Sequence, residues 1–413
     1  MRKTDAFRRA AALLAALSIT VSLAAPAFAG TYYYIDDGDI TITKDTDGKQ
    51  TVQQGSNAAK NIGDDEEIII TTRDQTITSL ESDLEGPAAE DSGFGPVVED
   101  NYQPAQPEDA EESEDADQPE SAEEPKSADR QESADQQAAP AAAPAGSTPV
   151  NKKDDGFWGN TITVINNIAD KVLNLTLKDV KIDVSDTGDQ YDWDQKGKAA
   201  LSVQGKGNVE IELDGDNELK SGTQSAGLEK TSTGTLTLKD DKEPGSLKAE
   251  GGTGAAGIGG SENNRTNNIT ISGGTVKAIG GPQSAGIGGG NYGRGNYGSG
   301  KNITIKGGTV TAKGGDCGAG IGGGNGGIGE NIKITDGTVN ATGGWGGAGI
   351  GGGDGGYGGY GNGKNITITD GTVTATGGIH GAGIGGGDSG IGEDITITGG
   401  TVNAAGSLSL IHI

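Results

Sequence analysis

A repeat of about thirty residues dominates the second half of the chain. Full copies begin at Asn268, Asn302, Asn331 and Asn365, and a partial copy begins at Asp394. The second copy reads NITIKGGTVTAKGGDCGAGIGGG, and the steps between copies alternate between 34 and 29 residues. One such unit cannot bury its own apolar residues, so successive copies must pack on one another as a solenoid or a propeller.

The apolar pattern inside one copy favours the solenoid. In the second copy, apolar residues occupy every second position in residues 303–305, 310–312 and 319–321. That spacing is the period of a β-strand, and the glycine pairs between the stretches are typical of turns. Propeller blades need longer strands and aromatic anchors. We therefore predict an all-β fold, a right-handed parallel β-helix with three short strands per coil.

Stacked coils place equivalent residues in columns about 4.8 Å apart. The expected apolar columns are Ile269–Ile303–Ile332, Val276–Val310–Val339 and Ile287–Ile321–Ile350. The asparagines that open the copies form a further column, in which stacked side chains can hydrogen-bond as a ladder. We expect this asparagine column to be structural. Gly318, Gly320 and Gly323 satisfy G-x-G-x-x-G, but no strand-to-helix context surrounds them, so we expect no dinucleotide site.

Residues 1–29 are a predicted secretory signal peptide. Basic residues between Arg2 and Arg9 precede the apolar run AAALLAALSITVSLAA, and Ala27-Phe28-Ala29 offers a cleavage site. The run is short for a membrane span. We expect a secreted or cell-surface protein with no membrane span after cleavage. Its single cysteine, Cys317, excludes an internal disulfide.

Residues 84–155 carry most of the net charge. Between Glu85 and Ala145, 18 acidic residues stand against Lys126 and Arg130, which contributes −16 to the net charge of −28. Large apolar residues are scarce there, so burial cannot offset the entropy of ordering, and we predict a disordered acidic spacer. Nothing in this charge pattern indicates nucleic-acid binding.

The remaining segments flank or follow this spacer. Residues 30–83 alternate like strands, and we predict that they form the first coil and cap the N-terminal edge, with the spacer as an inserted loop. Residues 156–407 form the predicted β-helix domain. Residues 408–413, LSLIHI, break the repeat and match the translation of a sequencing adapter. We interpret them as an artefact at a truncated end, beyond which a cell-wall anchor would lie.

Weaker copies of the repeat carry a family resemblance. The runs KVLNLTLKDVKIDV from Lys171, AALSVQGKGNVEIELDGDNELKSG from Ala199 and GTLTLKD from Gly234 lead into ITISGGTVKA. Over residues 161–406 the chain resembles the bacterial secreted carbohydrate-binding β-helix family, whose members bind cellulose and acidic plant polysaccharides and carry calcium. The GAGIGGG copies resemble surface proteins of gut Gram-positive bacteria. The resemblance implies polysaccharide binding outside the cell, and it carries over no ligand residue.

The residues that differ between copies are the candidate binding residues. The connections after the triple glycine are longer in alternate copies, and they contain Tyr292, Tyr297, Tyr357 and Tyr360, while Trp345 stands at another corner. Flat aromatic rings stack on sugars at a low entropic cost. The alternative is that each tyrosine packs on a neighbouring glycine-rich loop.

Acidic residues in the same copies raise the question of calcium. Asp354 and Asp388 follow the triple glycine, and Glu330 and Glu393 lie nearby in sequence. Oxygen ligands on glycine corners suit Ca²⁺, although ordinary Asx turns explain the same pattern. Apart from His412 in the terminal artefact, the only histidine is His380, so we expect no enzyme. A polysaccharide lyase or hydrolase is the minor alternative, and an adhesive solenoid that binds a host or bacterial protein is the main one.

Overall fold

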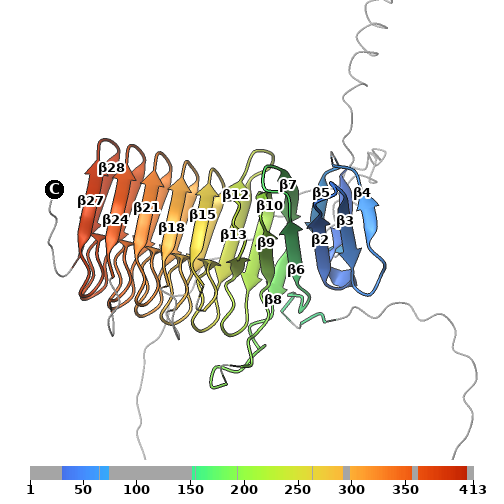
Figure 1. Ribbon diagram of the computed structural model, residues 1–413, viewed down its shortest axis with the longest axis horizontal. Coiled ribbons are helices and arrows are strands. Elements are labelled where there is room, and N and C mark those ends of the chain that lie inside the picture. Colours follow the sequence, from blue (N-terminus) through green and yellow to red (C-terminus); the bar gives the residue numbers. More distant parts are fainter. Residues whose placement is uncertain are drawn as a thin grey trace, which may run out of the picture. The chain divides into compact units, whose positions relative to one another are not determined.

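The computed structural model describes residues 30–64, 66–73, 151–153, 155–192, 194–262, 264–291, 298–355 and 361–406. These residues belong to one compact unit. The unit is a right-handed parallel β-helix, as the repeat predicts, and its coils follow one another from β6 to β28 in Figure 1. Residues 1–29, 74–150 and 407–413 lie outside the described residues. They include the predicted signal peptide, residues 84–150 of the predicted acidic spacer and the predicted artefact at residues 408–413.

Three sheets, here called A, C and B in the order in which each coil passes through them, form the walls of the solenoid. Sheet A contains β1 (Thr31–Tyr34), β5 (Ile68–Thr71), β7 (Val172–Lys178), the first half of β10 (Asn208–Lys220), β12 (Leu236–Lys239), β15 (Thr266–Ile271), β18 (Gly300–Ile305), β21 (Gly329–Ile334), β24 (Gly363–Ile368) and β27 (Gly392–Ile397). Sheet C contains β8 (Lys181–Asp183), the second half of β10, β13 (Gly245–Glu250), β16 (Thr275–Ile279), β19 (Thr309–Lys313), β22 (Thr338–Thr342), β25 (Thr372–Thr376) and β28 (Thr401–Ala405).

Sheet B is the narrowest wall. It contains β4 (Lys60–Ile62), β3 (Gln50–Gln54), β2 (Ile40–Lys44), β6 (Ile162–Asn166), β9 (Leu201–Gly205), β11 (Leu228–Lys230), β14 (Ile258–Gly259), β17 (Ile287–Gly288), β20 (Ile321–Gly322), β23 (Ile350–Gly351) and β26 (Ile384–Gly385). From β14 onward each B strand has only two residues, so glycine-rich turns form most of this wall.

The N-terminal segment pairs with the solenoid although the spacer separates them in sequence. β2 pairs in parallel with β6, with Ile40 opposite Ile162, and β5 pairs in parallel with β7. The buried amide of Asn160 donates a hydrogen bond to the carbonyl of Ile35, in the short 3-10 turn Ile35–Asp37, at 2.8 Å. β3 and β4 then extend sheet B antiparallel to β2. Residues 30–73 therefore add strands to the same sheets as the coils that follow.

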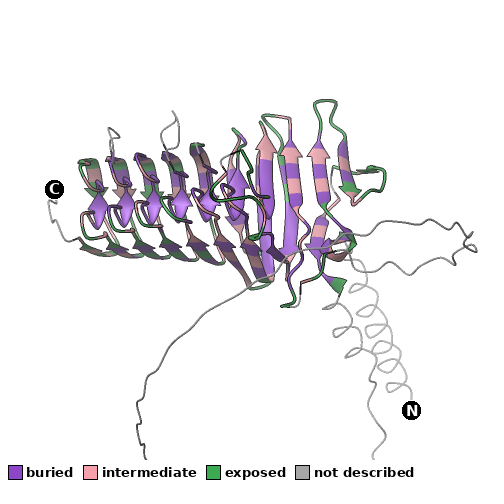
Figure 2. Ribbon diagram, turned by 90° about the horizontal axis from the view of Figure 1, so that it is seen from below, coloured by how far each residue is buried: buried purple, intermediate pink, exposed green. Residues whose placement is uncertain are grey.

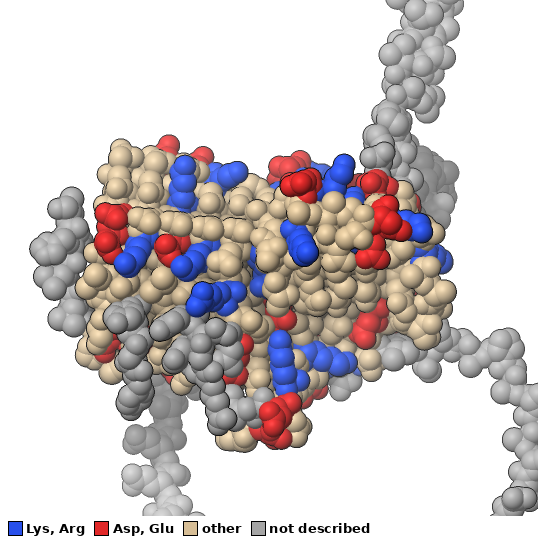
Figure 3. All heavy atoms as spheres, in the orientation of Figure 1, with Lys and Arg blue, Asp and Glu red and all other residues tan. Residues whose placement is uncertain are grey.

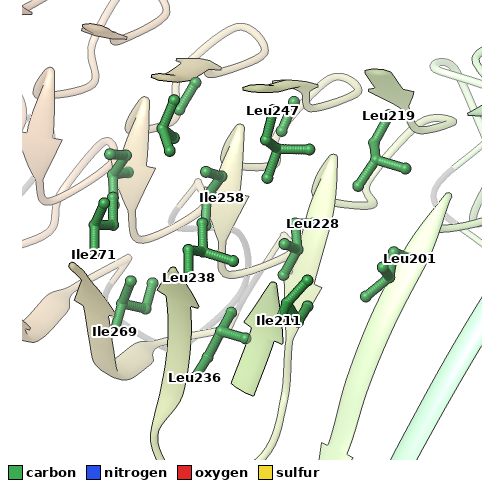
Figure 4. Close-up of a cluster of buried hydrophobic side chains, with 14 of the residues drawn as sticks. Leu201, Ile211, Leu219, Leu228, Leu236, Leu238, Leu247, Ile258, Ile269 and Ile271 are labelled. Carbon is green, nitrogen blue, oxygen red and sulfur yellow. The ribbon is translucent and has the colours of Figure 1, made fainter. Parts of the chain in front are cut away.

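The core consists of the predicted columns. Ile303 lies opposite Ile269 and Ile332, Val310 opposite Val276 and Val339, and Ile321 opposite Ile287 and Ile350. All of these side chains are fully buried, and the buried positions run along the inside of the coils as far as β26 in Figure 2. In the earlier coils leucines take the same places, and Figure 4 shows them converging from the three sheets. Burial of such side chains stabilises each coil by about 1.5–3 kcal/mol per residue.

The asparagine column is a ladder, as predicted. The side-chain amide of Asn302 donates to the side-chain oxygen of Asn268 at 2.9 Å, and the contact repeats from Asn331 to Asn302 at 2.9 Å and from Asn365 to Asn331 at 3.1 Å. The sequence pattern did not predict the backbone conformation of these residues. The four asparagines and Asp394 have φ between 52° and 59°, a left-handed conformation that asparagine tolerates better than most residues.

Candidate functional site

The edge where sheet C passes into sheet B is one of the two places at which side chains vary between copies; the other is the connection after the triple glycine. We call it the C–B edge and define it by one residue per coil: Thr223, Thr253, Pro282, Asp316, Trp345 and Ile379. From Thr253 onward, the glycine before each of these residues lies against the carbonyl of the equivalent glycine in the preceding coil, a series that starts at Gly222, so the six residues form one column. A side chain at such a position projects from a backbone that the coils on either side hold in place.

Trp345 is the predicted aromatic residue that the structure describes, and it lies on this edge. Its side chain is 51% exposed. Its ring meets the ring of His380, in the next coil, edge to face with the centroids 4.4 Å apart and the planes at 78°. The backbone N–H of His380 also donates to the carbonyl of Trp345 at 3.1 Å. The two rings are thus held together at the surface, and half of the indole stays open to solvent.

Gly346 explains the space around this pair. A Cβ at residue 346 would approach the Cβ of Asp354 to 2.7 Å, so a larger residue does not fit there. In the next coil the same place in the turn is taken by His380, whose ring turns towards Trp345. The residue after Trp345 therefore has no side chain, whereas the equivalent residue of the next coil supplies the ring that contacts Trp345.

The four predicted tyrosines lie outside the described residues. Tyr292 and Tyr297 belong to residues 292–297, and Tyr357 and Tyr360 belong to residues 356–360. The structure describes the residues on either side, which continue the B-to-A connections of their coils. A role for these tyrosines in carbohydrate binding stays a prediction.

Asp354 and Asp388 take part in the packing between coils. The backbone N–H of Asp354 donates to the carbonyl of Cys317 at 2.7 Å, and that of Asp388 donates to the carbonyl of Gly346 at 2.7 Å. The hydroxyl of Ser389 donates to the carboxylate of Asp388 at 3.2 Å. Burial, together with the negative charge of Asp354 beside it, raises the pKa of the Cys317 thiol to about 11, so this cysteine stays protonated at neutral pH.

Glu330 and Glu393 lie on sheet A and form ion pairs. Glu330 contacts Lys301, and Glu393 lies 2.7 Å from the ammonium of Lys364. The strand register places the four residues in one row, in which basic and acidic side chains alternate; Figure 3 shows this row over β18 to β27. Their hydrogen bond raises the pKa of Lys364, since Glu393 favours the charged form.

The four acidic residues predicted as calcium ligands do not gather at one point. Asp354 and Asp388 lie in B-to-A connections, whereas Glu330 and Glu393 pair with lysines on sheet A. Within the described ranges, no group of three or more His, Cys, Asp or Glu side chains is arranged to hold a metal ion. Calcium binding stays a prediction, and these contacts give the four residues structural roles.

A charged cavity on sheet A was not predicted from the sequence. It has a volume of about 350 Å³, and Glu67, Glu212, Lys239 and Lys242 are among its lining residues. The carboxylate of Glu212 accepts hydrogen bonds from the backbone N–H groups of Asp241 and Lys242, at 2.6 and 2.9 Å. Burial acts to raise the pKa of Glu67, but hydrogen bonds from Lys242 and Thr176 outweigh it and lower that pKa. Glu67 and Glu212 thus accept hydrogen bonds from other groups of the protein, which favours a structural role.

Tyr191 is the second exposed aromatic residue near the C–B edge, and sequence reasoning missed it. Its side chain is 84% exposed, and it lines an open cleft of about 580 Å³. The usable signal was the stretch SDTGDQYDWDQKG from Ser185, which has no counterpart in the later copies of the repeat. An insertion of this kind at a corner forms one side of a cleft beside the coils.

Comparison with known proteins identifies the repeat. Residues 269–291, 303–325, 332–354, 366–388 and 395–409 match the model of the Beta helix repeat family. These segments are similar to that family's repeat, which agrees with the β-helix that the strand pairings define. No curated protein and no solved structure matches the chain. Among the described residues, no helix has the length and apolar character needed to cross a membrane.

Proposed function

We propose that this protein is a secreted or cell-surface, non-catalytic β-helix that binds polysaccharide. The observation that carries the proposal is the Trp345–His380 pair, in which a half-exposed indole is held at the surface by the coil backbone. An aromatic face offers a large apolar contact to the C–H groups of a sugar ring, and a side chain already held in place loses little entropy on binding. The predicted signal peptide supports a location outside the cell.

The repetition of the coils supports a polymeric ligand. A solenoid presents the same corner once per coil, and such repeated corners make extended binding surfaces. Three of the acidic side chains described above are engaged in the fold: Glu330 and Glu393 pair with lysines, and Glu212 accepts two backbone hydrogen bonds. These contacts favour binding without catalysis.

An adhesive solenoid with a protein partner is the second candidate function. Ile379, next to Trp345 on the C–B edge, is 59% exposed, and exposed apolar residues together with an aromatic one also suit a protein interface. The two functions differ in ligand class, so a glycan array separates them.

The test is a glycan array probed with the wild-type protein and with Trp345→Ala, with calcium and with a chelator. We expect wild-type binding to at least one polysaccharide and a loss of about five- to tenfold in Trp345→Ala, because stacking on the indole disappears. Ile391→Ala is the matched control, since Ile391 is 59% exposed but lies away from the C–B edge. Equal binding by wild type and Trp345→Ala would contradict the proposal.

A further inference from the structure

We propose that the C–B edge is one continuous track for a linear polysaccharide without carboxylate or sulfate groups. The polysaccharide lies parallel to the solenoid axis. One part of it occupies the cleft beside Tyr191, and another part contacts Trp345 and His380. This inference rests on the proposed function, and it adds the path and the charge class of the ligand.

The cleft forms the first part of the track. Its lining includes Asp189, Tyr191, Lys220 and Glu250, and it reaches across three successive coils to Thr223, Thr253 and Pro282. Those last three residues are the first three members of the C–B edge. The cleft and Trp345 therefore lie on the same corner of the solenoid.

The loop that carries Tyr191 is held in place by its own hydrogen bonds. The hydroxyl of Thr187 donates to the carbonyl of Val184 at 2.6 Å and accepts from the backbone N–H of Lys198 at 2.8 Å. The carboxylate of Asp189 accepts from the backbone N–H of Tyr191 at 2.8 Å. In Figure 1 this green loop extends past the coils near β8. These bonds fix the backbone on which the ring of Tyr191 is carried.

The loop is also tied to the first residue of the edge. The backbone N–H of Thr223 donates to the carbonyl of Thr187 at 3.1 Å, and the carbonyl of Thr223 accepts from the backbone N–H of Gly197 at 2.8 Å. The position of Tyr191 is thus set relative to the coils. A ligand in the cleft can therefore contact both the ring of Tyr191 and the corner residue Thr223, since both line the cleft.

The spacing of the coils allows one polysaccharide chain to contact both Tyr191 and Trp345. Two coil steps separate Pro282, at the end of the cleft, from Trp345, which is about 10 Å at the usual strand spacing. The whole edge from Thr223 to Ile379 covers five steps, or about 24 Å. A linear oligosaccharide can span this distance, whereas a monosaccharide or disaccharide contacts only one end.

The charges on the track determine the class of sugar. Asp186, Asp189 and Glu250 line the cleft, and Asp316 is exposed between Pro282 and Trp345. Asp186 lies 3.0 Å from the ammonium of Lys153 and Glu250 lies 2.7 Å from that of Lys248, which offsets part of this negative charge. The one basic lining residue, Lys220, lies 3.5 Å from Asp183 and 3.6 Å from Glu218, with its ammonium 3.9 Å from the ring centroid of Phe157. Carboxylates accept hydrogen bonds from sugar hydroxyls, and they repel uronate or sulfate groups.

The experiment is calorimetric titration of the full chain with octasaccharides and disaccharides of cellulose, mannan and xylan, and with an octagalacturonate. We expect at least one neutral octasaccharide to bind with a stoichiometry of one octasaccharide per protein molecule. It should bind more tightly than its disaccharide and more tightly than the octagalacturonate. Tyr191→Ala and Trp345→Ala should each weaken that octasaccharide about five- to tenfold without changing the stoichiometry.

Two controls guard the interpretation. Tyr191→Phe keeps the ring and should restore binding, and Tyr32→Ala removes a 46% exposed ring from β1, away from the edge, and should change nothing. Thermal unfolding checks that each variant folds.

The outcomes separate this inference from the proposed function. Octasaccharide binding that depends on Trp345 but is unchanged in Tyr191→Ala overturns the track and leaves the proposed function standing. Tighter binding of the galacturonate overturns the charge class. Two ligands per molecule, one lost in each variant, show separate sites and also overturn the track. If the wild type binds no glycan in the titration or on the array, both proposals fail.

Discussion

Lys230, on β11, is the largest fully buried side chain among the described residues. Its ammonium donates a hydrogen bond to the carbonyl of Ser232 at 2.8 Å. Burial lowers the pKa of Lys230 from 10.5 to about 8, because the charged form is poorly solvated inside the wall. At neutral pH the folded protein therefore keeps a charge where an apolar side chain would be more favourable.

The free energy of unfolding should depend on pH through Lys230. The unfolded chain binds this proton more tightly than the folded chain, so the contribution of Lys230 to stability rises with pH between about 8 and 10.5. We expect Lys230→Met to be more stable than the wild type by about 3 kcal/mol at pH 7, a difference that shrinks towards pH 10.5. Urea unfolding of both proteins across this range measures it. If the difference in the free energy of unfolding between the two proteins did not change with pH, the charge on Lys230 would not be the cause of that difference.

At the scale of one coil, the glycines set how closely neighbouring coils approach. A Cβ on Gly318 would overlap the carbonyl of Ser284 in the preceding coil, and a Cβ on Gly320 would lie 2.6 Å from the backbone nitrogen of Thr342 in the next. The G-x-G-x-x-G phrase thus serves the contact between coils. These glycines flank the two-residue strands of sheet B, where the backbones of neighbouring coils approach too closely to admit a Cβ.

Replacing one of these glycines should loosen the stack of coils. We expect Gly318→Ala to lower the free energy of unfolding by at least about 2 kcal/mol, since overpacking against a backbone carbonyl forces the coils apart. Gly63→Ala is the matched control, because its Cβ would lie 4.0 Å from the Cβ of Glu66, an ordinary van der Waals distance. Chemical denaturation followed by circular dichroism compares them. An equal effect of both substitutions would contradict this role of Gly318.

The periodic parts of each coil were predictable from the sequence. Apolar residues at every second position, repeated at a fixed step, leave few alternatives to stacked columns, and Ile303 and Val310 lie where the step places them. The left-handed backbone at Asn302 was not predictable, because the hydrogen-bond ladder explains the asparagine equally well without it. Ion pairs such as Glu393–Lys364 depend on which residues face each other across strands, and sequence spacing alone suggested calcium ligands instead.

At the scale of the whole molecule, the solenoid brings distant insertions onto one edge. Trp345 was predictable as a corner residue because it differs from its counterparts in neighbouring copies. Tyr191 was not, since its loop occurs once and no period assigns it to the same corner; the hydrogen bonds of Thr223 with Thr187 and Gly197 do so in the structure. The edge that results joins a cleft and an aromatic pair over five coil steps.

The crystal structure of the protein with a neutral linear octasaccharide tests this account most directly. The account predicts sugar residues along the C–B edge, parallel to the solenoid axis, with rings stacked on Tyr191 and on Trp345 beside His380. An octasaccharide bound to sheet A, or one that crosses the coils at the C–B edge without touching both aromatic residues, would contradict it.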